Sequence, residues 1–148
     1  MRSELDGLAP APAPGPADYH RRLVHYVEDN ETNVEVMRGI LAQRPQVEMQ
    51  VSMTGGEGLA AIRARWPDLV LLDMHLPDMN GMTLLQALKA DPRTADIPVV
   101  VVSADALSQQ IDAALEAGCS HYLTKPVNVG ELLTVLDELL ERMDTRFG

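Results

Sequence analysis

Apolar positions along this chain follow two alternating patterns. Five short runs rich in Val, Ile and Leu are typical of buried strands, and each is followed by apolar residues at helical spacing. The predicted strands lie at about residues 22–27, 47–53, 68–73, 98–103 and 119–123. Because strands that alternate with helices form parallel sheets with right-handed crossovers, the pattern predicts an α/β domain.

The predicted helices differ in how clearly the sequence marks their ends. Apolar residues recur at three- and four-residue steps from Val129 to Met143, and Asn128 with Glu131 three residues later is consistent with a cap. Gly118 is expected to end the fourth helix. Gly58 lowers the helix propensity of the second predicted helix, and we expect the start of that helix to be irregular. The four earlier helices are predicted at about residues 31–43, 56–65, 81–90 and 106–117.

Five strands joined by helices are expected to form a doubly wound (βα)5 parallel sheet with helices on both faces, a flavodoxin-like α/β architecture. Strand order 2-1-3-4-5 is the common solution for five strands, and its switch point lies between the first and third strands. The spacing of the elements also allows other orders. In the common order, the carboxyl ends of the first and third strands lie side by side.

Side chains capable of chemistry follow four of the predicted strands. Glu28 and Asp29 follow the first strand, Asp73 ends the third, Ser103 ends the fourth, and Lys125 follows the fifth. Open α/β sheets carry their ligand sites at the carboxyl ends of the strands. We therefore expect these side chains to form one site.

The charges of this predicted site suit phosphoryl transfer. Three converging carboxylates, those of Glu28, Asp29 and Asp73, must either bind a proton or be neutralised by a cation. Mg²⁺ is the natural candidate, because it binds a few carboxylates and keeps several waters. Asp73 could then attack phosphorus as a covalent nucleophile. Mg²⁺, Lys125 and the Ser103 hydroxyl with nearby N–H groups would each neutralise one oxygen of the incoming group.

The combined pattern resembles the receiver domain of two-component response regulators, which has the CheY-like fold. An acid pair, an Asp with Pro four and Gly eight residues later, a hydroxyl thirty residues after that Asp, an aromatic residue and a Lys-Pro pair all occur in the family's order. The resemblance covers about residues 21–143. The string from Val27 to Asn33 is also similar to receivers of hybrid sensor kinases and of single-domain regulators.

The resemblance implies roles for the charged residues. Asp73 would accept phosphate from a sensor histidine kinase or a histidine phosphotransfer domain. Glu28, Asp29 and Asp73 would bind Mg²⁺ together with the main-chain carbonyl of His75, and Lys125 would bind the phosphoryl group. The His75 side chain stands at a position that influences dephosphorylation in the family.

The resemblance also implies a conformational switch. Ser103 and Tyr122 would be the switch pair: phosphorylation draws the serine toward the phosphate, and the tyrosine moves into the vacated space. The surface formed by the fourth helix, the fifth strand and the fifth helix would change and signal to a protein partner. The Lys125-Pro126 bond is expected to be cis, as in relatives. Asn80, where many relatives have Asp, lies in a predicted turn and should not affect the chemistry.

Composition excludes several functional classes. The net charge of -10 argues against direct binding of nucleic acid or anionic membranes. No apolar run approaches the roughly 20 residues that cross a bilayer, and the N-terminus has no signal-peptide segment. The single cysteine, Cys119, excludes an internal disulfide, so we expect a cytoplasmic protein. The four histidines lack the paired spacing of a zinc site.

The two ends of the chain bear on its organisation. Residues 1–19 include an Ala-Pro repeat that cannot form a helix or an inner strand, so they are predicted to be a disordered tail or linker before a receiver domain at 20–148. The chain ends soon after the last helix. Output is therefore expected through a protein contact, a homodimer formed by the fourth helix, fifth strand and fifth helix, a phosphate relay, or a domain outside this sequence.

Two other functions use the same fold or chemistry. A docking module that never needs phosphorylation is the main alternative, although it would not need every site element. An aspartyl phosphatase usually has a second acid two residues after its nucleophile, where this chain has His75. We therefore expect a regulatory domain that catalyses only its own phosphorylation and dephosphorylation.

Overall fold

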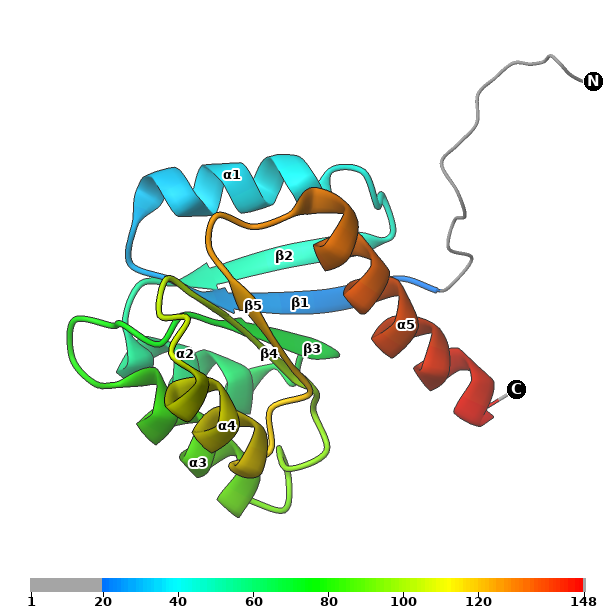
Figure 1. Cartoon of the computed structure of the whole chain (residues 1–148). Helices are drawn as coiled ribbons and strands as arrows, with labels where there is room; N and C mark the ends of the chain where they lie inside the picture. Colours follow the sequence, from blue (N-terminus) through cyan, green and yellow to red (C-terminus); the bar gives the residue numbers. More distant parts are fainter. Residues whose placement is uncertain (1–19, 148) are drawn as a thin grey trace, which may run out of the picture.

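The strands of this chain form one parallel sheet. The computed structural model describes residues 20–147, with side chains as far as Arg142, so the predicted tail at 1–19 lies outside the described residues. The strands are β1 (Arg22–Val27), β2 (Val47–Ser52), β3 (Leu69–Leu72), β4 (Val99–Ser103) and β5 (His121–Thr124). Their order is β2-β1-β3-β4-β5, which confirms the predicted doubly wound fold (Figure 1).

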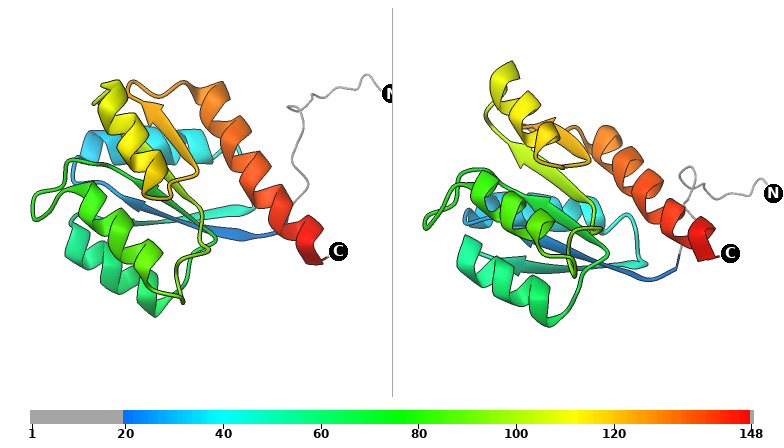
Figure 2. Two further views of the ribbon diagram at one scale, coloured as in Figure 1. Left: turned by 60° about the horizontal axis from the view of Figure 1, so that its bottom comes forward. Right: turned by 90° about the horizontal axis from the view of Figure 1, so that it is seen from below.

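Helices cover both faces of the sheet. The five helices are α1 (Glu31–Leu41), α2 (Gly55–Ala64), α3 (Gly81–Ala90), α4 (Ser108–Glu116) and α5 (Val129–Phe147). Helices α1 and α5 lie on one face, and α2, α3 and α4 lie on the other (Figure 2). Among residues 20–147, no helix is both long and apolar enough to span a bilayer.

The alternation of side chains along the strands creates two cores. In β3, Leu69 and Leu71 pack with α1 and α5, whereas Val70 and Leu72 pack with α2, α3 and α4. All four side chains are fully buried. A strand buried on both faces is apolar along most of its length, which is why β3 and the first four residues of β4 are continuous apolar runs in the sequence.

The strand register brings the chemically active strand ends together. Val27 of β1 pairs with Leu72 of β3, and the N–H of Asp73 donates to the Val27 carbonyl at 3.1 Å. At the next two strands, the N–H of Lys125 donates to the Ser103 carbonyl at 2.8 Å. These backbone hydrogen bonds fix residues from four strands along the same edge of the sheet.

Helix α2 begins more regularly than the sequence predicts. We expected Gly58 to disturb its start, but the helix is continuous from Gly55. The Thr54 hydroxyl caps one N–H of the first turn, and the Asp78 carboxylate accepts the N–H groups of Gly55 and Gly56 at 2.8 and 2.9 Å. Gly58 is needed for packing, because a Cβ there would lie 2.9 Å from a valine methyl of β1.

The start of β5 also differs from the prediction. The strand begins at His121, two residues later than the apolar pattern suggests. Gly118 ends the preceding helix with a φ of 114°, as expected, and the N–H of Cys119 then donates back to the Ala114 carbonyl at 3.1 Å. Cys119 is buried in the core, but it belongs to this turn and not to the strand.

Removing core volume under α5 should destabilise the whole domain. Leu136 is fully buried between α5 and the sheet, so Leu136→Ala should lower the free energy of unfolding by about 2–4 kcal/mol. Urea denaturation measures this change. The matched control is Val36→Ala on α1, where the side chain is 55% exposed and the expected change is within about 0.5 kcal/mol. Equal losses in the two variants would contradict the assignment of the core.

Candidate functional site

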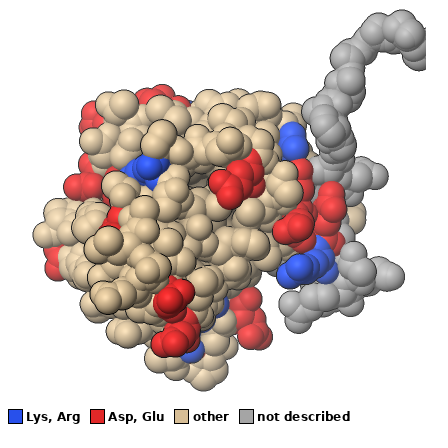
Figure 3. Space-filling view, viewed as in Figure 1, with Lys and Arg blue, Asp and Glu red and all other residues tan. Residues whose placement is uncertain are grey.

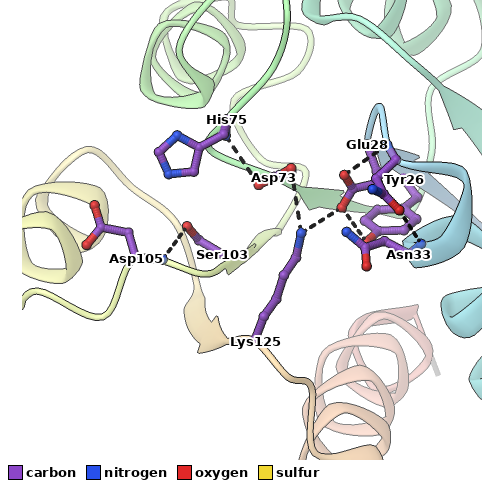
Figure 4. A network of polar contacts seen from close by, with 9 residues as sticks. Tyr26, Glu28, Asn33, Asp73, His75, Ser103, Asp105 and Lys125 are labelled. Atoms are coloured by element: carbon purple, nitrogen blue, oxygen red, sulfur yellow. Dashed lines mark hydrogen bonds and ion pairs between the residues drawn. The ribbon is translucent and has the colours of Figure 1, made fainter.

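Four predicted site residues meet at the carboxyl edge of the sheet (Figure 4). The ammonium of Lys125 extends from the end of β5 and lies 2.8 Å from the Glu28 Oε1 and 3.6 Å from the Asp73 Oδ2. Ser103 lies at the end of β4 on the other side of Asp73. The Lys125-Pro126 peptide bond is cis, as the resemblance implies.

The acidic residues form a compact group of oxygen donors. Glu28, Asp29 and Asp73 each place one carboxylate oxygen within 4.8 Å of the others. Glu28 is 1% exposed and Asp73 is 4% exposed, whereas Asp29 is open to solvent. Hard divalent cations bind such oxygen donors and retain water on their open side. The residues present therefore fit Mg²⁺.

The two buried carboxylates have unequal electrostatic environments. Burial raises the pKa of Asp73 to about 6, and the nearby Glu28 adds to the rise, although the His75 N–H opposes it. Burial would also raise the pKa of Glu28, but the hydrogen bond and charge of Lys125 lower it below its ordinary value. The Lys125 ammonium therefore stabilises the negative charge of Glu28 more than that of Asp73. The carboxylate of Asp73 can still be stabilised by a further cation.

Tyr26 also belongs to the site, although it was not recognised in the sequence. Its buried hydroxyl donates to the Glu28 Oε1 at 3.0 Å, and burial raises its pKa. The other carboxylate oxygen, Oε2, accepts the N–H of Asn30 at 3.2 Å. The spacing in the sequence could have identified it. Residues two apart along an extended chain point to the same face, so the Tyr26 side chain can contact Glu28.

Ser103 and Tyr122 are connected through one residue of the loop after β4. The hydroxyl of Ser103, which is fully buried, accepts the N–H of Asp105 at 3.1 Å. The Tyr122 hydroxyl donates to the carbonyl of the same Asp105 at 2.7 Å. Sequence reasoning paired Ser103 with Tyr122 but missed Asp105, which no pattern in the sequence marks. The two side chains therefore hold one loop residue from two neighbouring strands.

The loop that carries Asp73 is held at both ends. The N–H of His75 donates to the Asp73 Oδ1 at 3.2 Å, while the His75 side chain is exposed. Asn80 caps α3, and a Cβ at Gly81 would lie 2.5 Å from the Asp73 carbonyl, so only glycine fits there. Asp78 attaches the middle of the loop to the first turn of α2. A metal-binding role for the His75 carbonyl stays a prediction.

The raised pKa of Asp73 predicts a pH-dependent cost in the metal-free protein. The folded carboxyl has a pKa of about 6 against an ordinary 3.8. The contribution of Asp73 to stability is therefore most favourable below about pH 4 and is lost as the pH rises through about 6. In EDTA, Asp73→Asn should raise the free energy of unfolding by about 1–3 kcal/mol near pH 7.5 and by almost nothing near pH 4.

Urea denaturation at the two pH values measures this difference. Asp96→Asn, which removes an exposed acid from the loop before β4, provides the matched control and should leave the pH dependence unchanged. A stabilisation by Asp73→Asn of the same size at both pH values would show that charge is not its cause.

Comparisons with known proteins agree with this geometry. The response regulator receiver domain family model matches residues 24–137. The polar-differentiation response regulator DivK of Brucella ovis is 32% identical over 117 residues, which cover 79% of this chain and 94% of DivK. The DNA-binding dual master transcriptional regulator RpaA of Synechocystis is 34% identical over 116 residues, or 78% of this chain. The match includes 48% of RpaA, so this chain spans about half of that relative.

A solved structure shares the fold. The receiver domain of the Pseudomonas aeruginosa sensor histidine kinase PA1611, which has a magnesium ion coordinated in its active-site cleft, is 24% identical with a TM-score of 0.74. The match covers 82% of this chain and 98% of that one. The family match extends from β1 into α5 and includes every residue of the site described above. The chain belongs to the receiver domain family of two-component response regulators.

Proposed function

We propose that this receiver is a phosphorylation-dependent switch in which Asp73 accepts a phosphoryl group from a histidine kinase or a phosphotransfer domain. The observation that carries the proposal is the buried Asp73 carboxylate, 3.6 Å from the Lys125 ammonium and beside two further acids. Its pKa of about 6 leaves most of the carboxyl ionised at neutral pH. A carboxylate in this state can act as a nucleophile.

Mg²⁺ is the proposed cofactor. Glu28, Asp29 and Asp73 would hold it together with the main-chain carbonyl of His75. When bound, Mg²⁺ supplies positive charge next to the oxygens of the incoming phosphoryl group. The compact oxygen cluster of this chain supports the assignment, as does the magnesium ion in the cleft of the PA1611 receiver.

The transfer moves one phosphoryl group between two nucleophiles. An oxygen of Asp73 forms a bond to phosphorus as the bond from phosphorus to the donor histidine nitrogen breaks, and the nitrogen keeps the electron pair. The donor ring, protonated on its other nitrogen before the transfer, leaves as a neutral imidazole, and the other product is an aspartyl phosphate. Lys125 would leave Glu28 to pair with one phosphoryl oxygen, and the Ser103 hydroxyl would donate to another. Catalysis of this kind consists mainly of positioning and charge neutralisation.

The phosphate would change the loop that Ser103 and Tyr122 hold. A group with nearly two negative charges attracts the Ser103 hydroxyl, and movement of its oxygen toward the phosphate would release the N–H of Asp105. With Asp105 displaced, the Tyr122 hydroxyl loses its acceptor and its ring can turn inward. The loop precedes α4, so the surface formed by α4, β5 and α5 changes with it.

This output surface is suited to a protein contact. The face over β5 carries few acidic or basic side chains (Figure 3), whereas α4 has the exposed acids Asp112 and Glu116. Leu107, at the start of α4, is 65% exposed, and Leu115 in the same helix is also exposed. A downstream protein or a second copy of the chain could cover them, and the homodimer stays a prediction. The same side chains favour the alternative of docking without phosphorylation. The predicted cytoplasmic location also stays a prediction.

Incubation with acetyl phosphate and Mg²⁺ tests the proposal. Intact mass spectrometry should show one phosphoryl group on the wild-type chain and none on Asp73→Asn. Lys125→Ala should be phosphorylated at least about tenfold more slowly, because one developing charge loses its partner. Asp96→Asn is the matched control and should react like wild type.

Two outcomes would contradict the proposed function. A wild-type chain that gains no phosphoryl group, or one that gains it equally well in EDTA, lacks the Mg²⁺-dependent transfer. Tight binding of a partner by such an unmodified chain would favour the docking module. Many rapid turnovers of unrelated phosphate esters would indicate a phosphatase.

A further inference from the structure

We propose that Tyr26 is a positioning residue, whose hydroxyl holds the Glu28 carboxylate in place while Lys125 moves from Glu28 to the phosphoryl group. The inference rests on the proposed function, because it concerns the transfer step at the same site. It assigns a task to a side chain that would otherwise be regarded as part of the core.

Two donors share one oxygen of Glu28. The Oε1 accepts the Lys125 ammonium at 2.8 Å and the Tyr26 hydroxyl at 3.0 Å, whereas the Oε2 accepts the more distant Asn30 N–H, at 3.2 Å. Glu28 is almost completely buried. A buried acceptor that loses its donor is costly.

The two donors differ in mobility. The Tyr26 ring is 1% exposed and belongs to the core cluster that includes Met37 and Ile40 of α1. The Lys125 side chain is partly exposed and ends in a rotatable ammonium on a flexible stem. Its ammonium already lies 3.6 Å from the Asp73 Oδ2, so a short movement brings it to a phosphoryl group on Asp73. The Tyr26 ring, in contrast, is enclosed by the core on one face of the sheet.

The consequence appears when Lys125 pairs with the phosphoryl group. In the wild-type chain, the Glu28 Oε1 then keeps the Tyr26 hydroxyl as its donor, and the carboxylate stays oriented toward Asp29 and Asp73. Without that hydroxyl, the same movement leaves a buried carboxylate oxygen unpaired. The resting state is affected less, because Lys125 still occupies the oxygen there. Loss of the hydroxyl should therefore slow the transfer more than it weakens Mg²⁺ binding.

The test compares phosphorylation of wild type and Tyr26→Phe by acetyl phosphate over a range of Mg²⁺ concentrations. We expect the rate at saturating Mg²⁺ to fall by about tenfold, the lower end of the usual effect of removing a hydrogen bond to a metal ligand. The half-saturating Mg²⁺ concentration should change by a smaller factor than the rate, because Lys125 still pairs with Glu28 before the transfer. Thr94→Val is the matched control, because it removes a buried hydroxyl that binds the Leu88 carbonyl away from the site. Its rate should match that of wild type.

A second background tests the contact itself. In Glu28→Asp, the carboxylate is one methylene shorter and loses its reach to the Tyr26 hydroxyl. Adding Tyr26→Phe to that variant should lower its rate by less than about twofold, since coupling is confined to residues in contact. An undiminished tenfold effect in this background would show that Tyr26 acts elsewhere and would overturn the inference.

The remaining outcomes separate the inference from the proposed function. If wild type is phosphorylated and Tyr26→Phe has the same rate at saturating Mg²⁺, the inference fails and the proposed function stands. If Tyr26→Phe does not fold, as measured by circular dichroism, Tyr26 serves only the core and the inference fails. If wild type takes no phosphoryl group, the proposed function fails and the inference fails with it.

Discussion

The carboxyl edge of the sheet carries three neighbouring carboxylates and one ammonium, and the properties of the site follow from this excess of negative charge. Glu28 and Asp73 are almost fully buried, Asp29 lies beside them, and among these groups Lys125 is the one cation, at 2.8 Å from the first and 3.6 Å from the second. Buried carboxylates without enough positive charge either bind a proton or attract a cation. The raised pKa of Asp73 reflects this shortage. The same shortage makes the edge receptive to a divalent ion.

The sheet maintains this unfavourable arrangement because each charged side chain follows a rigid strand. The strands β1 and β3 pair as far as Val27 and Leu72, and the N–H of Asp73 then donates to the Val27 carbonyl. At the end of β4, the Ser103 carbonyl accepts the N–H of Lys125. Repulsion between the acids acts on side chains whose backbones cannot separate without breaking the sheet. The buried apolar residues of β3 and β4 thus stabilise the fold that keeps the carboxylates together.

The sequence predicts those parts of the molecule that depend on local periodicity. Continuous apolar runs indicate buried strands, and their ends indicate where Asp73 and Lys125 emerge. Contacts between distant segments are different: the Asp78 carboxylate binds the start of α2 from more than twenty residues away. That interaction is the reason why the glycine-rich start of α2 is regular, and local propensity cannot reveal it. Tyr26 was missed for a related reason, since a strand aromatic usually indicates only packing.

Under the proposed function, the contacts of Asp105 would link a new charge on Asp73 to the surface around α4. The Ser103 hydroxyl accepts the N–H of Asp105, and the Tyr122 hydroxyl donates to the carbonyl of Asp105. A movement of the Ser103 oxygen away from this loop would break the first bond and leave Asp105 held from the Tyr122 side. Each bond contributes about 0.5–1.5 kcal/mol, and a new charge-assisted bond from Ser103 to a phosphate contributes about 1.5–3 kcal/mol. The two arrangements are therefore close in free energy. A switch requires such near balance, because a ligand shifts an equilibrium only by its differential affinity for the two states.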